Sequence, residues 1–180
     1  LPYDRGGMGM MGSASTTIPL LTLNYTSAAT AAVALPGALN SIADLGVATT
    51  NKRLVFSSGM GMGGMGGGMM SFLIDGKSFD PSRVDLTSRV NEIEQWTIEN
   101  RSSMDHPFHL HGTQFQVVSR PRSGVTVAEP FLAWRDTVNV AALETVVFKV
   151  VQRQLGRRIY HCHILEHEDQ GMMGVLDVVA

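Results

Sequence analysis

The stretch His161-Cys162-His163-Ile164-Leu165-Glu166-His167 contains the only cysteine of the 180-residue chain and three of its six histidines. A second stretch, His106-Pro107-Phe108-His109-Leu110-His111, contains the other three histidines. Histidines that served only packing or solubility would not all collect in two short stretches, one of them around the single thiol. Met172 adds a thioether five residues after the first stretch. Imidazoles, one thiolate and a thioether form the ligand set of a blue-copper site, so these residues predict a protein that binds copper.

The spacing of the histidines predicts two separate ligand sets if both stretches are β-strands. Side chains alternate between the two faces of a strand, so the histidines on either side of Cys162 point away from its thiol. His109 and His111 share one face in the same way, and His106 takes the opposite face. Pairing the two strands then places Cys162 and His106 on one side and four imidazoles on the other.

The first set is completed by His167 and Met172, which a loop after the strand can fold back towards Cys162. This is the composition of an electron-transfer copper site. The second set consists of the four remaining imidazoles, those of His109, His111, His161 and His163. Because Cys162 is covalently joined to two of them, the sequence connects one predicted metal site to the other.

A packing role and a structural zinc site both fit the same residues less well than copper does. Single histidines are often hydrogen-bonded core or surface residues, and a lone cysteine often packs as a small hydrophobic side chain. A structural zinc site would use cysteine and histidine, but it would need neither Met172 nor four additional imidazoles.

Composition limits the class of protein. A hydrophobic content of 44% allows a sizeable core, and a net charge of −2 without a basic run argues against nucleic acid or an anionic membrane as a partner. No stretch approaches the ~18–20 consecutive apolar residues of a membrane span. A single cysteine excludes an internal disulfide.

Short alternating segments predict an all-β sandwich from residue 52 to the end of the chain. The expected strands are Leu54–Ser57, Ser71–Ile74, Glu92–Glu99, Phe108–Ser119, Thr137–Val140, Thr145–Gln152, Arg158–Cys162 and Met173–Val179. Glycine-rich and methionine-rich stretches at residues 6–12 and 59–70 predict mobile loops.

Residues 1–51 are predicted to lie outside the sandwich domain. Residues 1–26 are interpreted as the tail of a preceding domain, with a possible strand at Thr17–Tyr25. Residues 27–51 are interpreted as a linker with one short helical turn near Leu39–Leu45. The first residues resemble neither an initiator start nor a secretory signal, which predicts that the sequence begins within a longer protein.

The stretches Met104–Gly112 and His161–Met173 closely resemble copper motifs of the multicopper oxidases, the family of laccases, bacterial cuprous oxidases and ascorbate oxidase. The resemblance covers about residues 52–180 and implies the C-terminal cupredoxin domain, a Greek-key β-sandwich. It implies that type 1 copper is bound by His106, Cys162, His167 and Met172. It further implies type 2 copper at His109 and a type 3 pair at His111, His161 and His163.

The resemblance also implies an activity. A reductant, phenolic or Cu(I), would give single electrons to type 1 copper, and a trinuclear cluster would reduce dioxygen to water. The family builds that cluster from histidines of its first and last domains, and this chain contains only the last domain's half. We therefore expect amino-terminal cupredoxin domains of the same oxidase as partners and little oxygen reduction by the isolated chain. Periplasmic or extracellular location is implied by the resemblance alone.

Acidic residues near the histidines are candidates for supporting roles. Ligating imidazoles usually donate their free N–H to a carboxylate or carbonyl, so Asp105, Glu166, Glu168 or Asp169 are candidates to orient a ring. Glu168 occupies the place where, by resemblance, family members have a proton-delivering acid. Ser102 stands where some cuprous oxidases have a substrate-binding aspartate. Leu165 and Trp134 are candidates either to pack around type 1 copper or to join the core.

Three further questions stay open at the level of sequence. Eight of the eleven methionines lie in the two glycine-rich stretches, where they serve either to recruit Cu(I) or as an adaptable hydrophobic cover for phenol oxidation. A stand-alone blue-copper electron carrier would use the first ligand set but would not need the second. A degenerate cupredoxin used for protein interaction would not retain every expected ligand.

Overall fold

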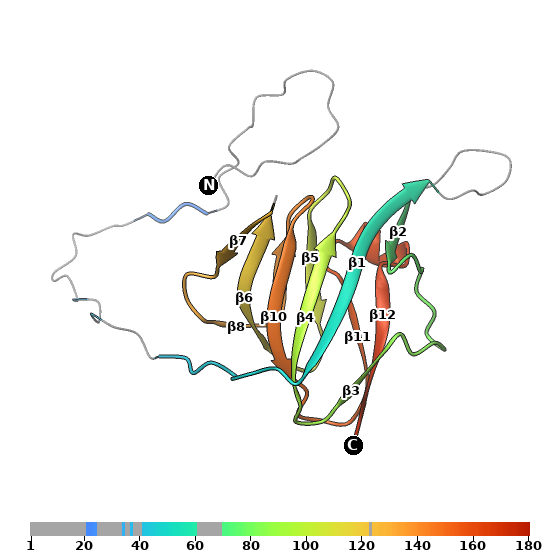
Figure 1. The fold of residues 1–180 in the computed structure, drawn as a ribbon. Helices are drawn as coiled ribbons and strands as arrows, with labels where there is room; N and C mark the ends of the chain where they lie inside the picture. The colour runs from blue at the N-terminus through green and yellow to red at the C-terminus, as the bar shows by residue number, and fades with distance from the viewer. Residues whose placement is uncertain (1–20, 25–33, 35–36, 38–40, 61–69, 123) are drawn as a thin grey trace, which may run out of the picture. The chain divides into compact units, whose positions relative to one another are not determined.

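The computed structural model describes residues 21–24, 34, 37, 41–60, 70–122 and 124–180. The chain divides into two compact units, Leu1–Ser41 and Ile42–Ala180. All strands and the helix of the described residues lie in the second unit (Figure 1). No helix among these residues has both the length and the apolar character needed to cross a membrane.

The described residues of the second unit form twelve strands and one short helix. The elements are β1 (Thr50–Met60), β2 (Met70–Ile74), β3 (Leu86–Arg89), β4 (Ile93–Asn100), β5 (His106–Leu110), β6 (Phe115–Arg122), β7 (Val125–Ala128), β8 (Trp134–Arg135), β9 (Thr137–Val140), β10 (Thr145–Val151), β11 (Gly156–Cys162), α1 (Leu165–Asp169) and β12 (Met173–Val179).

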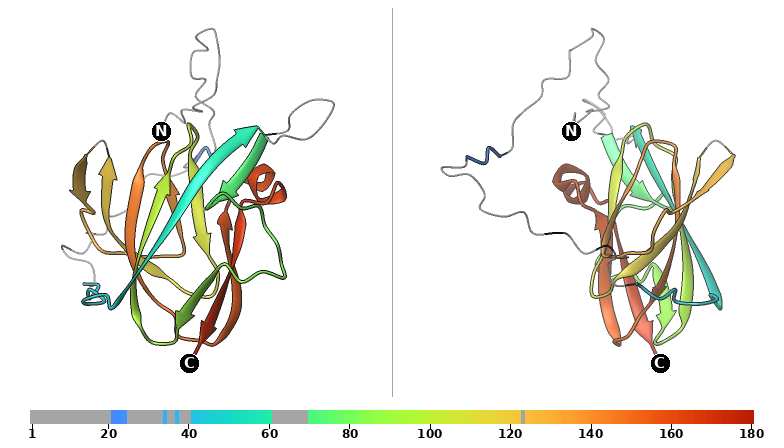
Figure 2. Two further views of the ribbon diagram at one scale, coloured as in Figure 1. Left: turned by 45° about the vertical axis from the view of Figure 1, so that its right-hand side comes forward. Right: turned by 90° about the vertical axis from the view of Figure 1, so that its left-hand side faces the viewer.

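The strands form two sheets that face each other as a sandwich (Figure 2). A seven-stranded sheet has the order β2-β1-β4-β10-β6-β7, with β8 paired to β6, and a five-stranded sheet has the order β3-β12-β11-β5-β9. Large buried side chains from both sheets meet between them, including Trp96 and Phe148 from one sheet and Phe108 and Tyr160 from the other. The predicted all-β, cupredoxin-like sandwich is confirmed.

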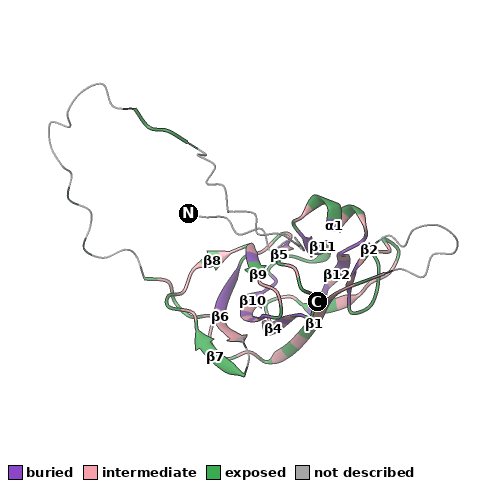
Figure 3. Cartoon of the chain, turned by 90° about the horizontal axis from the view of Figure 1, so that it is seen from above, coloured by how far each residue is buried: buried purple, intermediate pink, exposed green. Residues whose placement is uncertain are grey.

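Alternating burial along the strands explains why the sequence forms this core. In β4 and β10, buried and half-buried residues alternate along the strand, as expected when one face packs on the opposite sheet. In contrast, β7 at the edge of its sheet is exposed along its whole length (Figure 3). The strands that carry the histidines, β5 and β11, lie next to each other in the five-stranded sheet.

The prediction of one continuous strand over Phe108–Ser119 is wrong. β5 ends at Leu110 in the five-stranded sheet, and β6 begins at Phe115 in the seven-stranded sheet. Gly112 lies in the connecting turn with a φ of 71°, a conformation that favours glycine. Hydrophobic residues on both sides of this turn concealed the crossing between sheets, because periodicity alone does not show where a strand changes sheet.

The first expected strands are longer than predicted. β1 begins at Thr50, inside the stretch interpreted as a linker, because residues Thr50–Phe56 pair in parallel with β4. It continues to Met60 because Phe56–Met60 also pair with β2, so both ends of the stretch 59–70 belong to a hairpin. The rest of that stretch, 61–69, lies outside the described residues, as does 6–12.

Four elements were not anticipated, namely β3, β7, β8 and α1. Of the possible strand Thr17–Tyr25, only residues 21–24 are described, and they are irregular. Residues 41–45 are also irregular, so the described part of the expected helical turn is not helical. The division into a domain tail, a linker and a domain from residue 52 stays a prediction.

Candidate metal centre

Three predicted ligands come together in the interior of the sandwich. His106 begins β5, Cys162 ends β11, and the turn into α1 brings His167 back beside them. The exposed fractions of the three side chains are 0%, 0% and 3%, so the cluster is sealed from water. The chain therefore folds back after β11 as predicted, and α1 carries His167 to the thiol.

Distances within this cluster fit a single metal ion. Cys162 Sγ lies 3.6 Å from Nδ1 of His106 and 3.6 Å from Nδ1 of His167. The two Nδ1 atoms are 3.1 Å apart. Metal–nitrogen and metal–sulfur bonds of roughly 2.0–2.3 Å require neighbouring ligand atoms to be about 3–4 Å apart. The three donor atoms are thus already at the spacing of a trigonal site.

Met172 is tied to this cluster by its backbone. Its side chain is fully buried, its N–H donates to the carbonyl of His167 at 2.9 Å, and its carbonyl accepts from the N–H of Cys162 at 3.1 Å. Two imidazoles, a thiol and the thioether of Met172 are a soft donor set suited to copper.

Burial also sets the charge state of the cluster. It lowers the pKa of His106 to about 4, with a smaller contribution from neighbouring His167, and it lowers the pKa of His167 as well. Burial raises the pKa of the Cys162 thiol to about 11. The metal-free cluster is therefore neutral at pH 7, with imidazole lone pairs available and a thiol proton that a metal would displace.

Aromatic rings from the other sheet cover the two imidazoles. Phe72 of β2 stacks on His167 with ring centroids 3.7 Å apart and an interplanar angle of 22°. Phe56 of β1 meets the ring of His106 edge-on at 5.7 Å. The cluster is thus closed between a wall from the five-stranded sheet and aromatic side chains from the seven-stranded sheet.

Imidazoles of the second predicted set gather on the other face of the same strand pair. His161 lies directly opposite His109 in the register of β11 and β5, while Cys162 lies opposite Phe108. Ligand atoms of His109, His111 and His161 all lie within 4.8 Å of one another, and the Nε2 atoms of His111 and His161 are 3.0 Å apart. The structure therefore sorts the side chains onto opposite faces as the alternation predicts.

His163 lies beside this second group, with an exposed ring. Its ring centroid is 5.4 Å from that of His109 and 5.5 Å from that of His161. The predicted set of four is thus brought together as three close imidazoles and one neighbouring ring.

Hydrogen bonds orient two of these imidazoles. His109 Nδ1 lies 2.9 Å from the carbonyl oxygen of Asp136 and 2.9 Å from Oγ1 of Thr137. His161 Nδ1 lies 2.9 Å from the carbonyl oxygen of Cys162 and 3.2 Å from a carboxylate oxygen of Glu168. Because oxygen acceptors hold Nδ1–H in both rings, Nε2 is left free for a metal.

A hollow of about 700 Å³ opens beside the second group. His109 and His111 line it together with residues of the turn after β5 and of β8 and β10. Trp134 contributes to this hollow and is 43% exposed, so it neither packs around the first cluster nor joins the core. Leu165 is 68% exposed and also has no core role.

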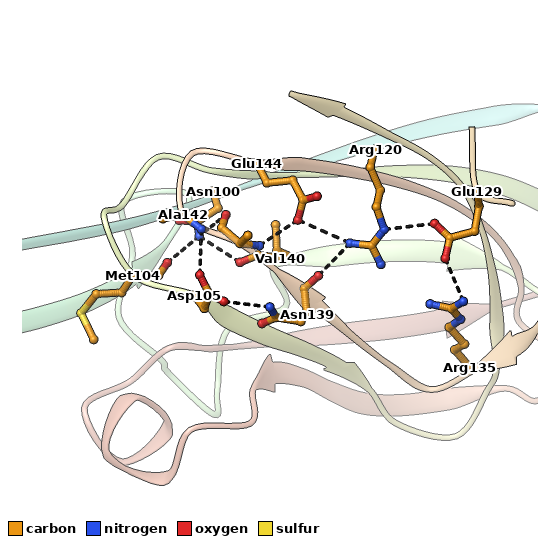
Figure 4. A network of polar contacts seen from close by, with 11 residues as sticks. Asn100, Met104, Asp105, Arg120, Glu129, Arg135, Asn139, Val140, Ala142 and Glu144 are labelled. Carbon is orange, nitrogen blue, oxygen red and sulfur yellow. Dashed lines mark hydrogen bonds and ion pairs between the residues drawn. The ribbon is translucent and has the colours of Figure 1, made fainter. Parts of the chain in front are cut away.

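The acids that were candidates to orient an imidazole are Asp105, Glu166, Glu168 and Asp169. Asp105 instead accepts hydrogen bonds from the side chain of Asn139 at 2.9 Å and the N–H of Ala142 at 3.0 Å (Figure 4). It fixes the turn after β9 rather than a ring. Glu166 and Asp169 are exposed on α1, and Glu168 is the acid that contacts an imidazole.

Sequence reasoning missed several residues that contact the clusters. Phe72, Asp136 and Thr137 carry no motif, and they reach the imidazoles through contacts between sheets or between paired strands. The register between β5 and β9, which sets Thr137 opposite His109, is the signal that would have found Thr137.

Comparison with known proteins agrees with this geometry. The sequence profile of one family, described as multicopper oxidase, matches residues 49–180. The chain belongs to the multicopper oxidase family. Membership in this family implies copper as the metal, and the donor set of the first cluster fits it.

Individual relatives show the extent of the likeness. A multicopper oxidase, mco, of Staphylococcus aureus is 45% identical over 109 residues, which are 58% of this chain and 24% of that protein. A solved multicopper oxidase of Campylobacter jejuni, described as a metallo-oxidase, is 42% identical with a TM-score of 0.75, over 81% of this chain and 33% of that chain. A solved laccase of Pediococcus acidilactici is 36% identical with a TM-score of 0.68, over 82% of this chain and 31% of that chain.

The chain spans only about a quarter to a third of the length of these multicopper oxidases. Its cupredoxin domain corresponds to one part of them, and the rest of each protein has no counterpart in the matched residues.

Proposed function

We propose that this chain is the C-terminal domain of a multicopper oxidase that oxidises a small reductant and reduces dioxygen to water. In this proposal His106, Cys162, His167 and Met172 hold type 1 copper. The second group holds half of a trinuclear cluster, with His109 at type 2 copper and His111, His161 and His163 at the type 3 pair. When bound, copper supplies one-electron oxidation at the first site and oxygen reduction at the second.

The observation that carries the proposal is the direct link between the two sites. Cys162 belongs to the first cluster and is joined by one peptide bond to His161 of the second group. The carbonyl of Cys162 also accepts a hydrogen bond from His161 Nδ1 at 2.9 Å. A single dipeptide thus provides both a covalent and a hydrogen-bonded connection, which a chain with one isolated metal site would not need.

The second group supports the proposal that other domains complete the active site. Its imidazoles lie beside an open hollow, whereas the first cluster is buried on all sides. Amino-terminal cupredoxin domains of the same oxidase would supply the remaining histidines and close this hollow. The isolated chain is then expected to bind type 1 copper without reducing oxygen.

Glu168 is proposed to deliver protons to the second site. Its carboxylate lies 3.2 Å from His161 Nδ1, and its side chain is 29% exposed. It therefore contacts both the imidazole group and the solvent, and oxygen reduction to water consumes protons. A carboxylate in this place can receive a proton from water and pass it towards the site.

The reductant is proposed to be Cu(I) or a phenol, with Cu(I) preferred. The Campylobacter jejuni relative is described as a metallo-oxidase, and the methionines of residues 60–70 are soft ligands suited to Cu(I). Deleting residues 61–69 in favour of a two-residue Asn-Gly turn keeps the connection between β1 and β2, whose last pair is Met60 and Met70. This deletion should slow Cu(I) oxidation by the complete oxidase and leave phenol oxidation unchanged; unchanged Cu(I) kinetics would contradict the preference.

Copper counting and visible absorption test the central proposal. The chain loaded with copper should show an intense charge-transfer band from the Cys162 thiolate, and mixing with the amino-terminal domains should restore oxygen reduction. Oxygen reduction by the chain alone as a monomer would contradict the shared cluster. A stand-alone electron carrier, the alternative, would show the blue band and gain no oxidase activity from the added domains. Location in the periplasm or outside the cell stays a prediction from the resemblance.

A further inference from the structure

Asn100, at the end of β4, has a side-chain orientation that its neighbours determine. Its Nδ2 atom lies 2.7 Å from the carbonyl oxygen of Met104, 3.1 Å from that of Val140 and 2.9 Å from that of Ala141 (Figure 4). Carbonyl oxygens only accept hydrogen bonds, so the donor end of the amide must face them. The acceptor end, Oδ1, must therefore point the opposite way.

Ser102 receives that acceptor end. Asn100 Oδ1 lies 2.9 Å from the backbone nitrogen of Ser102 and 2.8 Å from its Oγ. Neither Oδ1 nor the Met104 carbonyl, which is 3.1 Å from Oγ, can donate, so their short contacts with Oγ favour the hydroxyl hydrogen of Ser102 on that side. A serine hydroxyl has one hydrogen, so towards any other neighbour Oγ acts as an acceptor.

That other neighbour is an imidazole of the first cluster. His106 Nε2 lies 2.7 Å from Ser102 Oγ, and both side chains are buried. If the hydroxyl hydrogen pointed to Nε2 instead, Oγ would face Oδ1 at 2.8 Å and the Met104 carbonyl at 3.1 Å with no hydrogen between them. Nε2 therefore carries the hydrogen, and in a neutral ring Nδ1 then has the lone pair. Nδ1 is the atom that lies 3.6 Å from Cys162 Sγ.

We propose that Ser102 and Asn100 are positioning residues that fix His106 in the Nε2–H tautomer, with Nδ1 directed at the metal. The chain of contacts runs from three backbone carbonyls through Asn100 and Ser102 to His106. The role of this pair in copper binding rests on the proposed function, whereas the tautomer follows from the hydrogen bonds alone.

The surroundings of the pair support a fixed geometry. Asn100 and Ser102 are only 2% and 4% exposed, so water does not compete for their hydrogen bonds. The N–H of Asn100 donates to the carbonyl of Glu144 at 2.9 Å, and the carboxylate of Glu144 accepts from the N–H of Ala141 at 2.8 Å. This second contact holds the turn that presents a carbonyl to Asn100. The orienting contacts thus belong to the fold of β4, β9 and β10 rather than to a free loop.

The first experiment measures the tautomer in the metal-free chain by nitrogen-15 NMR of the histidine rings. We expect His106 to show a protonated Nε2 and an unprotonated Nδ1 in the unmodified chain. A protonated Nδ1 would overturn the proposal without any substitution. This measurement does not depend on oxidase activity or on copper.

The second experiment compares the copper affinity and visible spectrum of three variants at two adjacent positions, 102 and 103. Ser102→Ala removes the acceptor from Nε2, Ser102→Thr keeps a hydroxyl, and Ser103→Ala is the control because Ser103 is adjacent and exposed. Loss of an outer contact of this kind typically weakens metal binding roughly 10–100-fold. We expect that loss in copper affinity for Ser102→Ala, together with a shifted visible band, and we expect near-normal values for the other two variants.

The outcomes separate this inference from the proposed function. Equal copper affinity and identical spectra for Ser102→Ala and Ser103→Ala would overturn the positioning role even if the oxidase proposal holds. If the oxidase proposal fails but NMR shows the expected tautomer and its loss in Ser102→Ala, the hydrogen-bond relay stands. If Ser102→Ala does not fold, two other measurements decide. A protonated Nε2 of His106 in the unmodified chain and near-normal copper affinity of Ser102→Thr support the proposal, and a protonated Nδ1 overturns it.

Discussion

The two groups of histidines lie back to back on the strands β5 and β11, yet their surroundings differ sharply. The group around Cys162 is buried between the sheets and covered by Phe56 and Phe72. The group around His111 lies beside an open hollow. A site that one domain completes can be sealed inside its own core. If another domain completes the second group, as proposed, that group must stay accessible until the domain docks.

The largest expected effect separates the two groups by spectroscopy. Cys162→Ser removes the only thiolate and should abolish the visible charge-transfer band of the copper-loaded chain completely. His111→Ala is the matched control, since it alters the open group and should leave the band in place. Visible absorption and copper counting measure both variants. A band that survives Cys162→Ser would show that the buried group is not the source of the colour.

The next prediction concerns proton supply to the open group. Glu168→Gln keeps the shape of the side chain but removes its acid, and loss of such a group typically slows proton transfer roughly 10²–10⁴-fold. We expect a reduction of this order in oxygen consumption by the complete oxidase, with the blue band unchanged. Glu166→Gln, on the exposed side of α1, should have no comparable effect. Equal rates for the two variants would remove Glu168 from the mechanism.

A third prediction tests how the buried group is sealed. Phe72→Ala removes a side chain that is 4% exposed and stacks on His167, which should cost about 3–5 kcal/mol in the free energy of unfolding. Phe131→Ala is the control, because Phe131 is 64% exposed and its loss should change stability by less than about 0.5 kcal/mol. Denaturant unfolding of the metal-free chain provides the measurement. A similar loss in the free energy of unfolding for both variants would mean that Phe72 of β2 does not close the site.

The smallest effect expected is a pH dependence of the metal-free chain. Burial lowers the pKa of His106 from 6.5 to about 4 in the folded state, so the unfolded chain binds this proton more tightly. Stability should therefore fall as the pH falls from about 6.5 to about 4, by roughly 3 kcal/mol from this residue. His106→Leu cannot take up the proton and should lose less stability over the same range. The measurement is the free energy of unfolding of both chains as a function of pH. An equal loss of stability in the unmodified chain and in His106→Leu would show that burial does not lower the pKa of His106.

Much of the fold was predictable because hydrophobic and polar residues alternate along its strands. The strands Thr137–Val140 and Met173–Val179 were predicted with the bounds that the structure has, since each is a short alternating segment between turn residues. The crossing at Gly112 was not predicted, because the hydrophobic pattern continues on both sides of it. β3, β7 and β8 were missed because they lack an alternating buried face: β3 has one buried residue, and β7 and β8 have none.

The sequence by itself determined which atoms are available and on which face of a strand they lie. Alternation along β11 separates Cys162 from His161, and no packing arrangement of that strand can reverse this. Only the tertiary structure decided that α1 returns His167 to the thiol, that Phe72 covers it from the other sheet, and that Ser102 meets His106 Nε2. These contacts join segments far apart in the chain or set the exact path of a loop. They depend on sheet register and on turns that local sequence patterns do not encode.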